Sequence, residues 1–287
     1  MPEFLARQER FDSVGSTNDV VADWLATGTA EVALAVADVQ TAGRGRGDRS
    51  WVAPPGSALL LSLGFRPTWL APDQAWRLAA TAALAMADAA EEVAGLPDRA
   101  LRLKWPNDLV AETVGTAMPV APKRADRVRK VAGLLGESVG LGSGDPQVVV
   151  GLGIDTDWAA ADFPTELAST MTSLRELAHG RPIDHGALLD AFLGRLEVRI
   201  ESLREGRFDV ADWTERQLTT GRDVELVAPD GSVSTVRALG VDHRSGALVV
   251  ADPDAPTGER PVLVGEIRHL RVAPAPAPAH APDAVGV

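Results

Sequence analysis

The sequence predicts an α/β (α+β) protein in which a large domain of helices and strands precedes a small β domain. Helical patterns alternate with apolar runs typical of buried strands over residues 1–219. From Gly221 onwards the pattern changes to short β segments separated by turns, which places a small β-barrel at 220–272. A chain of 287 residues is long enough for both domains. Residues 273–287 are rich in alanine and proline and are expected to form a disordered tail.

The elements of the large domain follow from hydrophobic periodicity and from the residues that begin or end them. Ser16 or Thr17 suits the N-cap of an amphipathic helix, because a short side-chain oxygen can accept from a free amide of the first turn. Pro106 ends a short strand, so Asn107 and Asp108 are expected on a turn. The predicted strands are 31–39, 57–65, 101–105, 131–139 and 147–152; helices are predicted from 16 onwards and at 73–94, 183–203 and 210–218.

Three segments are predicted as connections. Residues 112–129 are polar, contain proline and have weak periodicity, which predicts a long surface loop. The glycine-rich segment 140–146 is predicted as the turn that joins two paired strands. In the small domain, Asp230-Gly231 and Ser245-Gly246 are typical turn dipeptides.

Composition limits the classes of function. The formal net charge of -12 at pH 7 argues against nucleic acid as the main partner, because phosphate neutralisation dominates that kind of affinity. The chain has no cysteine, which excludes disulfides, thiolate nucleophiles and cysteine-bound metals. Its first residues lack the apolar segment of a signal peptide, and no apolar run is long enough for a membrane span. A cytoplasmic protein is therefore expected. The histidines are scattered without metal-ligand spacing.

Residues 40–51, QTAGRGRGDRSW, are the segment most informative about function. Glycine lets main-chain amides turn toward a bound anion, and the arginine donor fork suits a carboxylate or a phosphate. A flexible surface loop and an RGG-like nucleic-acid segment are the alternatives. The dinucleotide fingerprint is excluded because Asp48 occupies the position of its third glycine. We expect an anion-binding loop that becomes ordered on its ligand.

Further motifs combine charge with glycine at strand ends. KWPND at 104–108 offers a cation, an amide and a carboxylate, which suits phosphate with magnesium; an Asx-type turn beside a solvated lysine is the alternative. Glycines within KVAGLLGE at 130–137 and GLGID at 151–155 indicate close approach of a ligand or another backbone, although plain turns carry the same pattern. Of the three lysines in the chain, Lys104 and Lys130 begin two of these motifs. A lysine retained among many arginines suggests a need for its compact ammonium.

The order of these motifs resembles that of the biotin–protein ligases. The matching pieces are Ser16-Thr17-Asn18, Gln40 with GRGR at 43–46, Trp51, KWPND, KVAGLLGE and GLGID, over roughly residues 11–272. The resemblance implies a catalytic domain at 1–219, with a mixed β-sheet backed by helices, and a C-terminal SH3-like β-barrel. It also implies a two-step reaction. Biotin and ATP form biotinyl-5′-AMP and pyrophosphate, and a lysine of a biotin carboxyl carrier domain then takes the biotinyl group.

The same resemblance implies residue roles, with Mg²⁺ as activator and no tightly bound prosthetic group. The catalytic residues would be Lys104, Lys130 and Arg46, and Mg²⁺ would bind Asp108. Biotin would contact Ser16, Thr17, Asn18, Gln40, Arg44, Gly45, Arg46, Trp51, Lys130 and Gly133. The nucleotide would contact Arg44, Arg49, Lys104, Asn107, Asp155 and Arg271.

Three features depart from the family pattern. Gly47-Asp48-Arg49 replaces the usual Arg-Gly-Arg, which removes one cation, adds an anion and is expected to loosen retention of the intermediate. Asp155 stands where the family usually has asparagine, and a carboxylate there would repel triphosphate unless magnesium intervened. The segment 112–129 is longer than in compact members.

Because Ser16 already belongs to the ligase core, the sequence leaves no room for an N-terminal helix-turn-helix domain. This predicts a monofunctional ligase, a monomer or weak homodimer, acting on the carrier domain of acyl-CoA carboxylases. Two alternatives stay open. A lipoate or octanoate ligase or transferase shares the fold, although its Arg-rich Gly-Gly-Gly signature is missing here. A non-catalytic regulator that binds biotinyl-AMP is the other.

Overall fold

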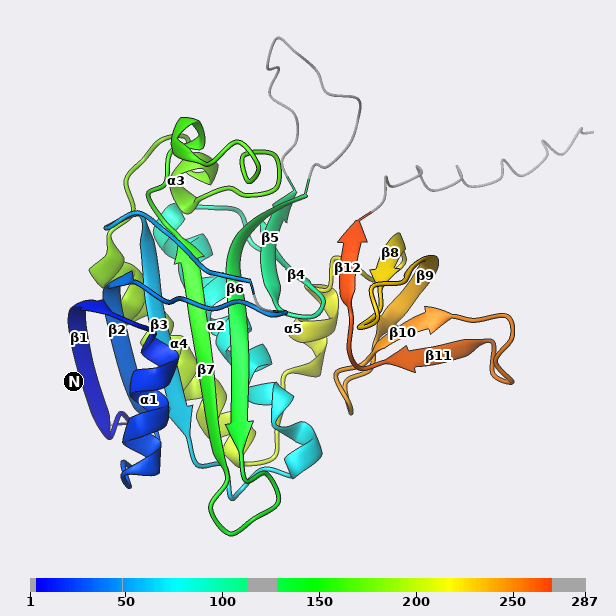
Figure 1. The fold of residues 1–287 in the computed structure, drawn as a ribbon, viewed down its shortest axis with the longest axis horizontal. Coiled ribbons are helices and arrows are strands. Elements are labelled where there is room, and N and C mark those ends of the chain that lie inside the picture. Colours follow the sequence, from blue (N-terminus) through cyan, green and yellow to red (C-terminus); the bar gives the residue numbers. More distant parts are fainter. Residues whose placement is uncertain (1–3, 48, 113–127, 270–287) are drawn as a thin grey trace, which may run out of the picture.

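Two β-sheets organise the chain in the computed structural model, which describes residues 4–47, 49–112 and 128–269 (Figure 1). The larger sheet has seven strands in the order β1-β2-β3-β7-β6-β5-β4. It is mixed, because β1 runs parallel to β2 whereas the other neighbours are antiparallel. The strands are β1 (Arg7–Val14), β2 (Ala33–Gln40), β3 (Ala58–Phe65), β4 (Leu101–Lys104), β5 (Asp108–Glu112), β6 (Val128–Val139) and β7 (Gln147–Asp155).

Helices cover both faces of this sheet. Helix α1 (Thr17–Ala26) lies on one face, and α2 (Trp76–Ala94) and α4 (His185–Arg204) lie together on the other (Figure 1). Two short helices, α3 (Leu174–Leu177) and α5 (Val210–Glu215), complete the set, with 3-10 turns at Pro72–Gln74 and Ala160–Asp162. The fold class expected from the sequence is therefore confirmed.

The side chains of β3 and β7 reflect this layered arrangement. Every residue of β3 is buried because helices cover the sheet on both sides, which explains its continuous apolar run. In β7, Leu152 and Ile154 point into the core beneath α2 and α4. Since successive strand residues face opposite sides, Gly151, Gly153 and Asp155 lie on the side of α1.

The smaller sheet has five antiparallel strands in the order β11-β10-β9-β8-β12, consistent with an SH3-like domain. Its core is joined to the larger sheet by Trp105, which is buried among Val224, Leu248 and other apolar residues of the small sheet. The Trp105 indole also donates a 3.0 Å hydrogen bond to the Gly246 carbonyl. The strands are β8 (Asp223–Val227), β9 (Val233–Val241), β10 (Leu248–Ala251), β11 (Glu259–Val262) and β12 (Glu266–His269).

Most sequence-based elements are confirmed. Ser16 occupies the N-cap of α1, and β6 and β7 pair across the expected turn at 140–146. The expected turns in the small sheet contain Gly231 and Gly246, whose positive φ values of 82° and 72° favour glycine.

Other assignments were wrong in detail. Asp108 does not lie on the turn after Pro106 but begins β5, opposite Lys104. The strands β1 and β5 were not anticipated. The expected loop at 112–129 is shorter than predicted, because Glu112 ends β5 and Val128 begins β6; residues 113–127 lie outside the described chain, as does the expected tail.

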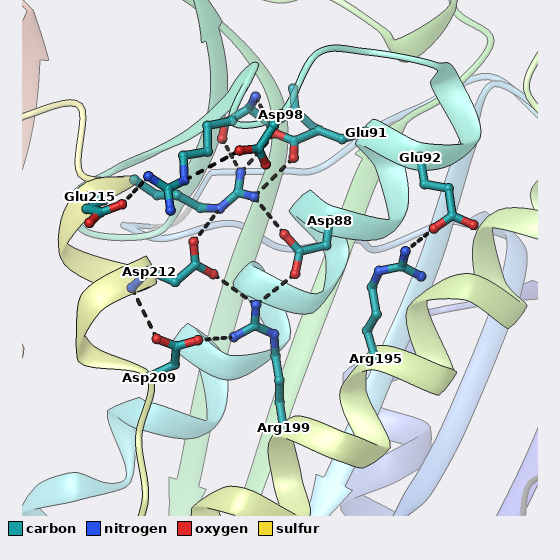
Figure 2. Close-up of polar contacts among 12 residues, drawn as sticks. Asp88, Glu91, Glu92, Asp98, Arg195, Arg199, Asp209, Asp212 and Glu215 are labelled. Atoms are coloured by element: carbon teal, nitrogen blue, oxygen red, sulfur yellow. Dashed lines mark hydrogen bonds and ion pairs between the residues drawn. The ribbon is translucent and has the colours of Figure 1, made fainter.

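A buried ion network ties α2, α4 and α5 together (Figure 2). Arg216, which is only 1% exposed, contacts Asp88, Glu91 and Asp212 at 2.6, 2.8 and 3.1 Å. Arg199 of α4 reaches the second oxygens of Asp88 and Asp212, as Figure 2 shows. Because the Arg216 carbonyl accepts from the Leu103 amide at 2.8 Å, the network also holds β4, the strand that ends in Lys104.

Among residues 4–47, 49–112 and 128–269, the helices are too short or too polar to cross a bilayer.

Candidate functional site

A cavity of about 480 Å³ lies on the α1 side of the larger sheet and is bordered by the small sheet. It is formed by the start of α1, the end of β2, the glycine-rich loop, the β4–β5 turn and the middle of β6 and β7. The segments 227–229 and 264–267 of the small sheet complete it. Segments far apart in the sequence therefore line the same cavity.

One end of the cavity is polar but uncharged. The Thr17 amide donates to Gln40 Oε1 at 2.7 Å, and the Thr17 hydroxyl lies 3.0 Å from the same oxygen. The Ser62 hydroxyl, buried in the middle of β3, lies 2.7 Å from Thr17 Oγ1 and 2.6 Å from Asn18 Oδ1. Because these short side chains orient one another, they present a preorganised set of neutral donors and acceptors.

Glu137 of β6 connects this end to the glycine-rich loop. Asn18 Nδ2 donates to Glu137 Oε2 at 2.5 Å, and the Arg44 guanidinium lies 3.2 Å from the same carboxylate. Arg44 also binds Asp19 through two hydrogen bonds of 2.9 and 2.7 Å, and this contact holds the pKa of the Asp19 carboxyl below its usual value. Arg44 therefore carries an internal ion pair at the rim of the cavity.

The glycine-rich loop folds back on itself. The Gly45 amide donates to the Arg49 carbonyl at 2.6 Å, and the Trp51 amide donates to the Gly43 carbonyl at 2.9 Å. The loop also contacts the start of β12: Arg46 donates to the carbonyl of Gly265, just before the strand, at 3.2 Å, and Arg49 pairs with Glu266, its first residue. The small sheet thus holds two arginines of the loop over the cavity.

Glycines form the floor beneath Trp51. A Cβ atom placed on Gly153 would lie 2.6 Å from the Trp51 ring, and one on Gly133 would lie 3.1 Å from it. The indole therefore lies directly on β6 and β7, so these glycines make room for a side chain, where the sequence predicted a ligand or another backbone. Lys130 Nζ lies 5.2 Å from the ring centroid, within the range of a cation–π contact.

The opposite end of the cavity is cationic. Lys130 Nζ lies 2.7 Å from Asp108 Oδ1, and Lys104 Nζ lies 3.7 Å from Oδ2 of the same carboxylate. Asn107 fixes the turn between them, because its Nδ2 donates to the Leu134 carbonyl at 2.7 Å and its carbonyl accepts from the Leu134 amide. With Arg46 and Arg49 above them, the two lysines create a site suited to carboxylate and phosphate groups.

The cavity thus gathers nearly all residues singled out in the sequence: Ser16, Thr17, Asn18, Gln40, Arg44, Gly45, Arg46, Arg49, Trp51, Lys104, Asn107, Asp108, Lys130 and Gly133. Asp155 is the exception among the described residues. It is buried and does not line the cavity, and burial raises its pKa to about 8. At neutral pH its carboxyl is therefore mostly protonated, which weakens the repulsion of triphosphate that was expected from the sequence. Arg271 and Asp48 lie outside the described residues.

Sequence reasoning gave no role to three residues of the site, Ser62, Asp19 and Glu137. Ser62 is the single polar residue in the apolar run ALLLSLGF, and that interruption is the signal that could have identified it. Glu137 closes the KVAGLLGE motif, but only the fold shows that it meets Asn18 and Arg44.

Asp108 fits a magnesium ion only as a single ligand. In the part of the chain that the structure describes, no three histidine or carboxylate side chains gather into a metal cluster. Asp108 itself is already paired with two ammonium groups. Magnesium commonly takes one or two carboxylates and completes its shell with water and substrate phosphates, so this donor set suits an ion that arrives with a nucleotide.

Comparisons with known proteins show which family and fold this chain is similar to. Residues 11–155 match the Biotin/lipoate A/B protein ligase family. The biotin–[acetyl-CoA-carboxylase] ligase of Mycobacterium tuberculosis is 32% identical over 270 residues, which cover 91% of this chain and 90% of that protein. The bifunctional ligase/repressor BirA of Bacillus subtilis is 29% identical over 83% of this chain and 67% of its own length. The fold resembles that of the Aquifex aeolicus biotin protein ligase in complex with biotin and ATP, with a TM-score of 0.69, 24% identity and coverage of 94% of this chain and all of that one.

Proposed function

The chain belongs to the Biotin/lipoate A/B protein ligase family, and from that premise we propose that it is a biotin–protein ligase that joins biotin to a carrier protein through biotinyl-5′-AMP. One observation supports this most strongly: a single cavity joins an uncharged hydrogen-bonding end to a cationic end across a floor of glycine and indole. Biotin has the matching sequence of groups, with a ureido ring, an apolar thioether ring and chain, and a carboxylate.

The uncharged end suits the ureido ring. A ureido group needs both donors and acceptors, and Thr17, Asn18 and Gln40 supply hydroxyl and amide groups, with the buried Ser62 orienting Thr17 and Asn18 from behind. Because these groups carry no charge, binding would replace hydrogen bonds to water without leaving a buried charge unpaired.

The cationic end suits the first chemical step. The biotin carboxylate attacks the α-phosphorus of ATP, a P–O bond forms, and pyrophosphate leaves. Lys130 and Lys104 would stabilise the negative charge on the carboxylate, the α-phosphate and the leaving group, and Asp108 would hold both ammonium groups in place. A magnesium ion bound with the triphosphate would neutralise part of that charge, with Asp108 as its protein ligand.

The second step needs an acceptor and no protein nucleophile. A lysine amine of the carrier domain attacks the carbonyl of the mixed anhydride, forms the amide and releases AMP. Arg46 and Arg49, held above the cavity by Gly265 and Glu266, would retain the anionic intermediate until the acceptor arrives.

The uncharged end also distinguishes this proposal from its main rival, a lipoate ligase. A dithiolane ring has no N–H or carbonyl group, so it would displace water from Thr17, Asn18 and Gln40 without replacing the hydrogen bonds of that water. A regulator that binds biotinyl-AMP without transferring it is the second rival.

One assay separates these functions. The purified protein is incubated with ATP, Mg²⁺ and a biotin carboxyl carrier domain, with either biotin or lipoate, and the carrier is followed by intact mass. A gain of one biotinyl group supports the proposal. A lipoyl gain would favour the rival ligase, and adenylate formed without transfer would favour the regulator.

Substituting Gly151 by alanine is expected to damage the uncharged end. A Cβ atom there would overlap Asn18 Oδ1, so the Asn18 amide would have to leave Ser62 and Glu137. We expect the KM for biotin to rise about 100-fold, as for a reacting or binding group misplaced by about 1 Å. Steady-state pyrophosphate release as a function of biotin concentration measures it.

Gly136→Ala is the matched control, because Gly136 also lies within a strand of the same sheet and a Cβ atom there would meet nothing within 4 Å. Its KM should stay near that of the wild type. An unchanged KM in Gly151→Ala would show that Asn18 does not contact biotin.

A further inference from the structure

Asp155 is the most unusual titratable group in the described chain. It ends β7, is 1% exposed, and neither of its oxygens finds a hydrogen-bond partner among the described residues. An ionised carboxylate in such surroundings would be very unfavourable, so the group stays neutral. It lies on the same strand face as Gly151 and Gly153, which line the cavity.

Among the described residues, Lys130 of β6 is the charged group that interacts with Asp155. Its attraction lowers the pKa of the Asp155 carboxyl group and so opposes the effect of burial, which raises it. On the other side β3 contributes the uncharged Ala58, and the segment 170–173 that pairs with Lys130 is uncharged. Further along the chain, His185 Nε2 lies 3.8 Å from Asp157 and 2.6 Å from the Thr156 hydroxyl.

Lys130 therefore interacts more strongly with Asp108 than with Asp155. Its ammonium lies 2.7 Å from Asp108, a contact that orients it toward the cavity. Lys130 makes no ion pair with Asp155, although its positive charge opposes the rise in the pKa of that carboxyl group. If Asp155 ionised, a buried charge without a partner would compete for the same ammonium.

We propose that Asp155 is a positioning residue that works as a neutral carboxylic acid, and that its ionisation draws Lys130 away from Asp108 and the reacting groups. The inference rests on the proposed function, which assigns Lys130 to the adenylation step. A neutral carboxylic acid has one donor and one acceptor, like a carboxamide. The neutral form can therefore both donate and accept a hydrogen bond, whereas the ionised form can only accept.

A pH profile tests the proposal. Burial raises the pKa of Asp155 to about 8, so the kcat of biotinyl-AMP formation should fall above that pH, by about tenfold at roughly one unit higher. Asp155→Asn cannot ionise and should keep its kcat over the same range. Pyrophosphate release at saturating biotin and ATP, at a temperature where both proteins stay folded, measures this difference.

Asp157→Asn is the control, because it removes a neighbouring carboxylate that pairs with His185 instead of Lys130. It should retain the alkaline loss of the wild type. Parallel profiles for the wild type and Asp155→Asn would overturn the proposal.

Thermal unfolding tests the protonation state independently of activity. Between the ordinary pKa of 3.8 and the raised value of about 8, folded Asp155 holds a proton that the unfolded chain has lost. Stability of the wild type therefore falls as the pH rises through this window, whereas that of Asp155→Asn has no such contribution. The Tm advantage of the variant should grow from about pH 5 to about pH 8. A constant difference would refute a neutral Asp155, and a lack of adenylation by the wild type at pH 7 would refute the proposed function instead.

Discussion

Replacing Lys130 by alanine is expected to lower the rate of biotinyl-AMP formation by about 10²–10³-fold, the usual effect of removing one group that stabilises transition-state charge. The substitution removes the ammonium that lies 2.7 Å from Asp108 and leaves that carboxylate facing the cavity with only Lys104, at 3.7 Å. The cavity would thus lose a cation and gain exposed negative charge where phosphate groups are to bind. Single-turnover pyrophosphate release measures the effect.

Two controls make this result interpretable. Arg10→Ala removes a cation paired with Asp38 on the exposed surface of β1 and β2, and it should leave pyrophosphate release unchanged. Unfolding curves of Lys130→Ala should overlay those of the wild type to within about 1 kcal/mol, as for other partly exposed ion pairs. Wild-type rates in Lys130→Ala would remove Lys130 from the mechanism.

The second large effect is on stability. Arg216→Met is expected to lower the free energy of unfolding by about 3–5 kcal/mol, because it leaves Asp88 and the buried Glu91 without their common cation. Urea unfolding followed by tryptophan fluorescence measures this loss as a lower midpoint at constant slope. The variant should also show weaker adenylation, since Arg216 and Leu218 hold Leu103 of β4 by backbone hydrogen bonds of 2.8 Å.

Arg195→Met is the matched control for this network. Arg195 of α4 pairs with Glu92 of α2 apart from the Arg216 network, as Figure 2 shows, and both side chains are partly exposed. Such surface pairs contribute about 0–1 kcal/mol, so Arg195→Met should unfold almost like the wild type. Equal losses for the two variants would show that burial of the Arg216 network adds nothing to stability.

The strands that the sequence predicted best are those buried on both faces. β3 and β7 are long apolar runs bounded by turn residues, a pattern that depends little on their neighbours. β1 (RQERFDSV) and β5 (DLVAE) were missed for opposite reasons. β1 is a polar edge strand that forms through pairing with β2, and β5 is short and begins directly after turn residues. Neither carries a local signal strong enough to identify it.

The residues of the candidate site also divide into those that a local sequence signal identifies and those that it does not. Its motif residues could be identified from type and order alone, because glycines within strands, an arginine-rich loop and lysines at strand ends each imply a chemistry on their own. The roles of Ser62 and Glu137 could not be predicted, since they depend on partners 44 to 45 and 93 to 119 positions away; the local sequence marks Ser62 only as a polar residue within an apolar run.

By itself, the sequence determined the class of fold, the change from a large region of helices and strands to a small β region, and the motif residues that carry charge or glycine. These follow from local periodicity and residue type, which are properties of short segments. Only the tertiary structure decided that Trp51 lies on Gly133 and Gly153, that Arg44 is held by Asp19 and Glu137, and that Asp155 is neutral. The charge state of a side chain and its partners depend on burial and on groups brought together from distant segments. The free energy of ionising a carboxyl group is therefore set by its environment in the fold and not by its neighbours in the chain.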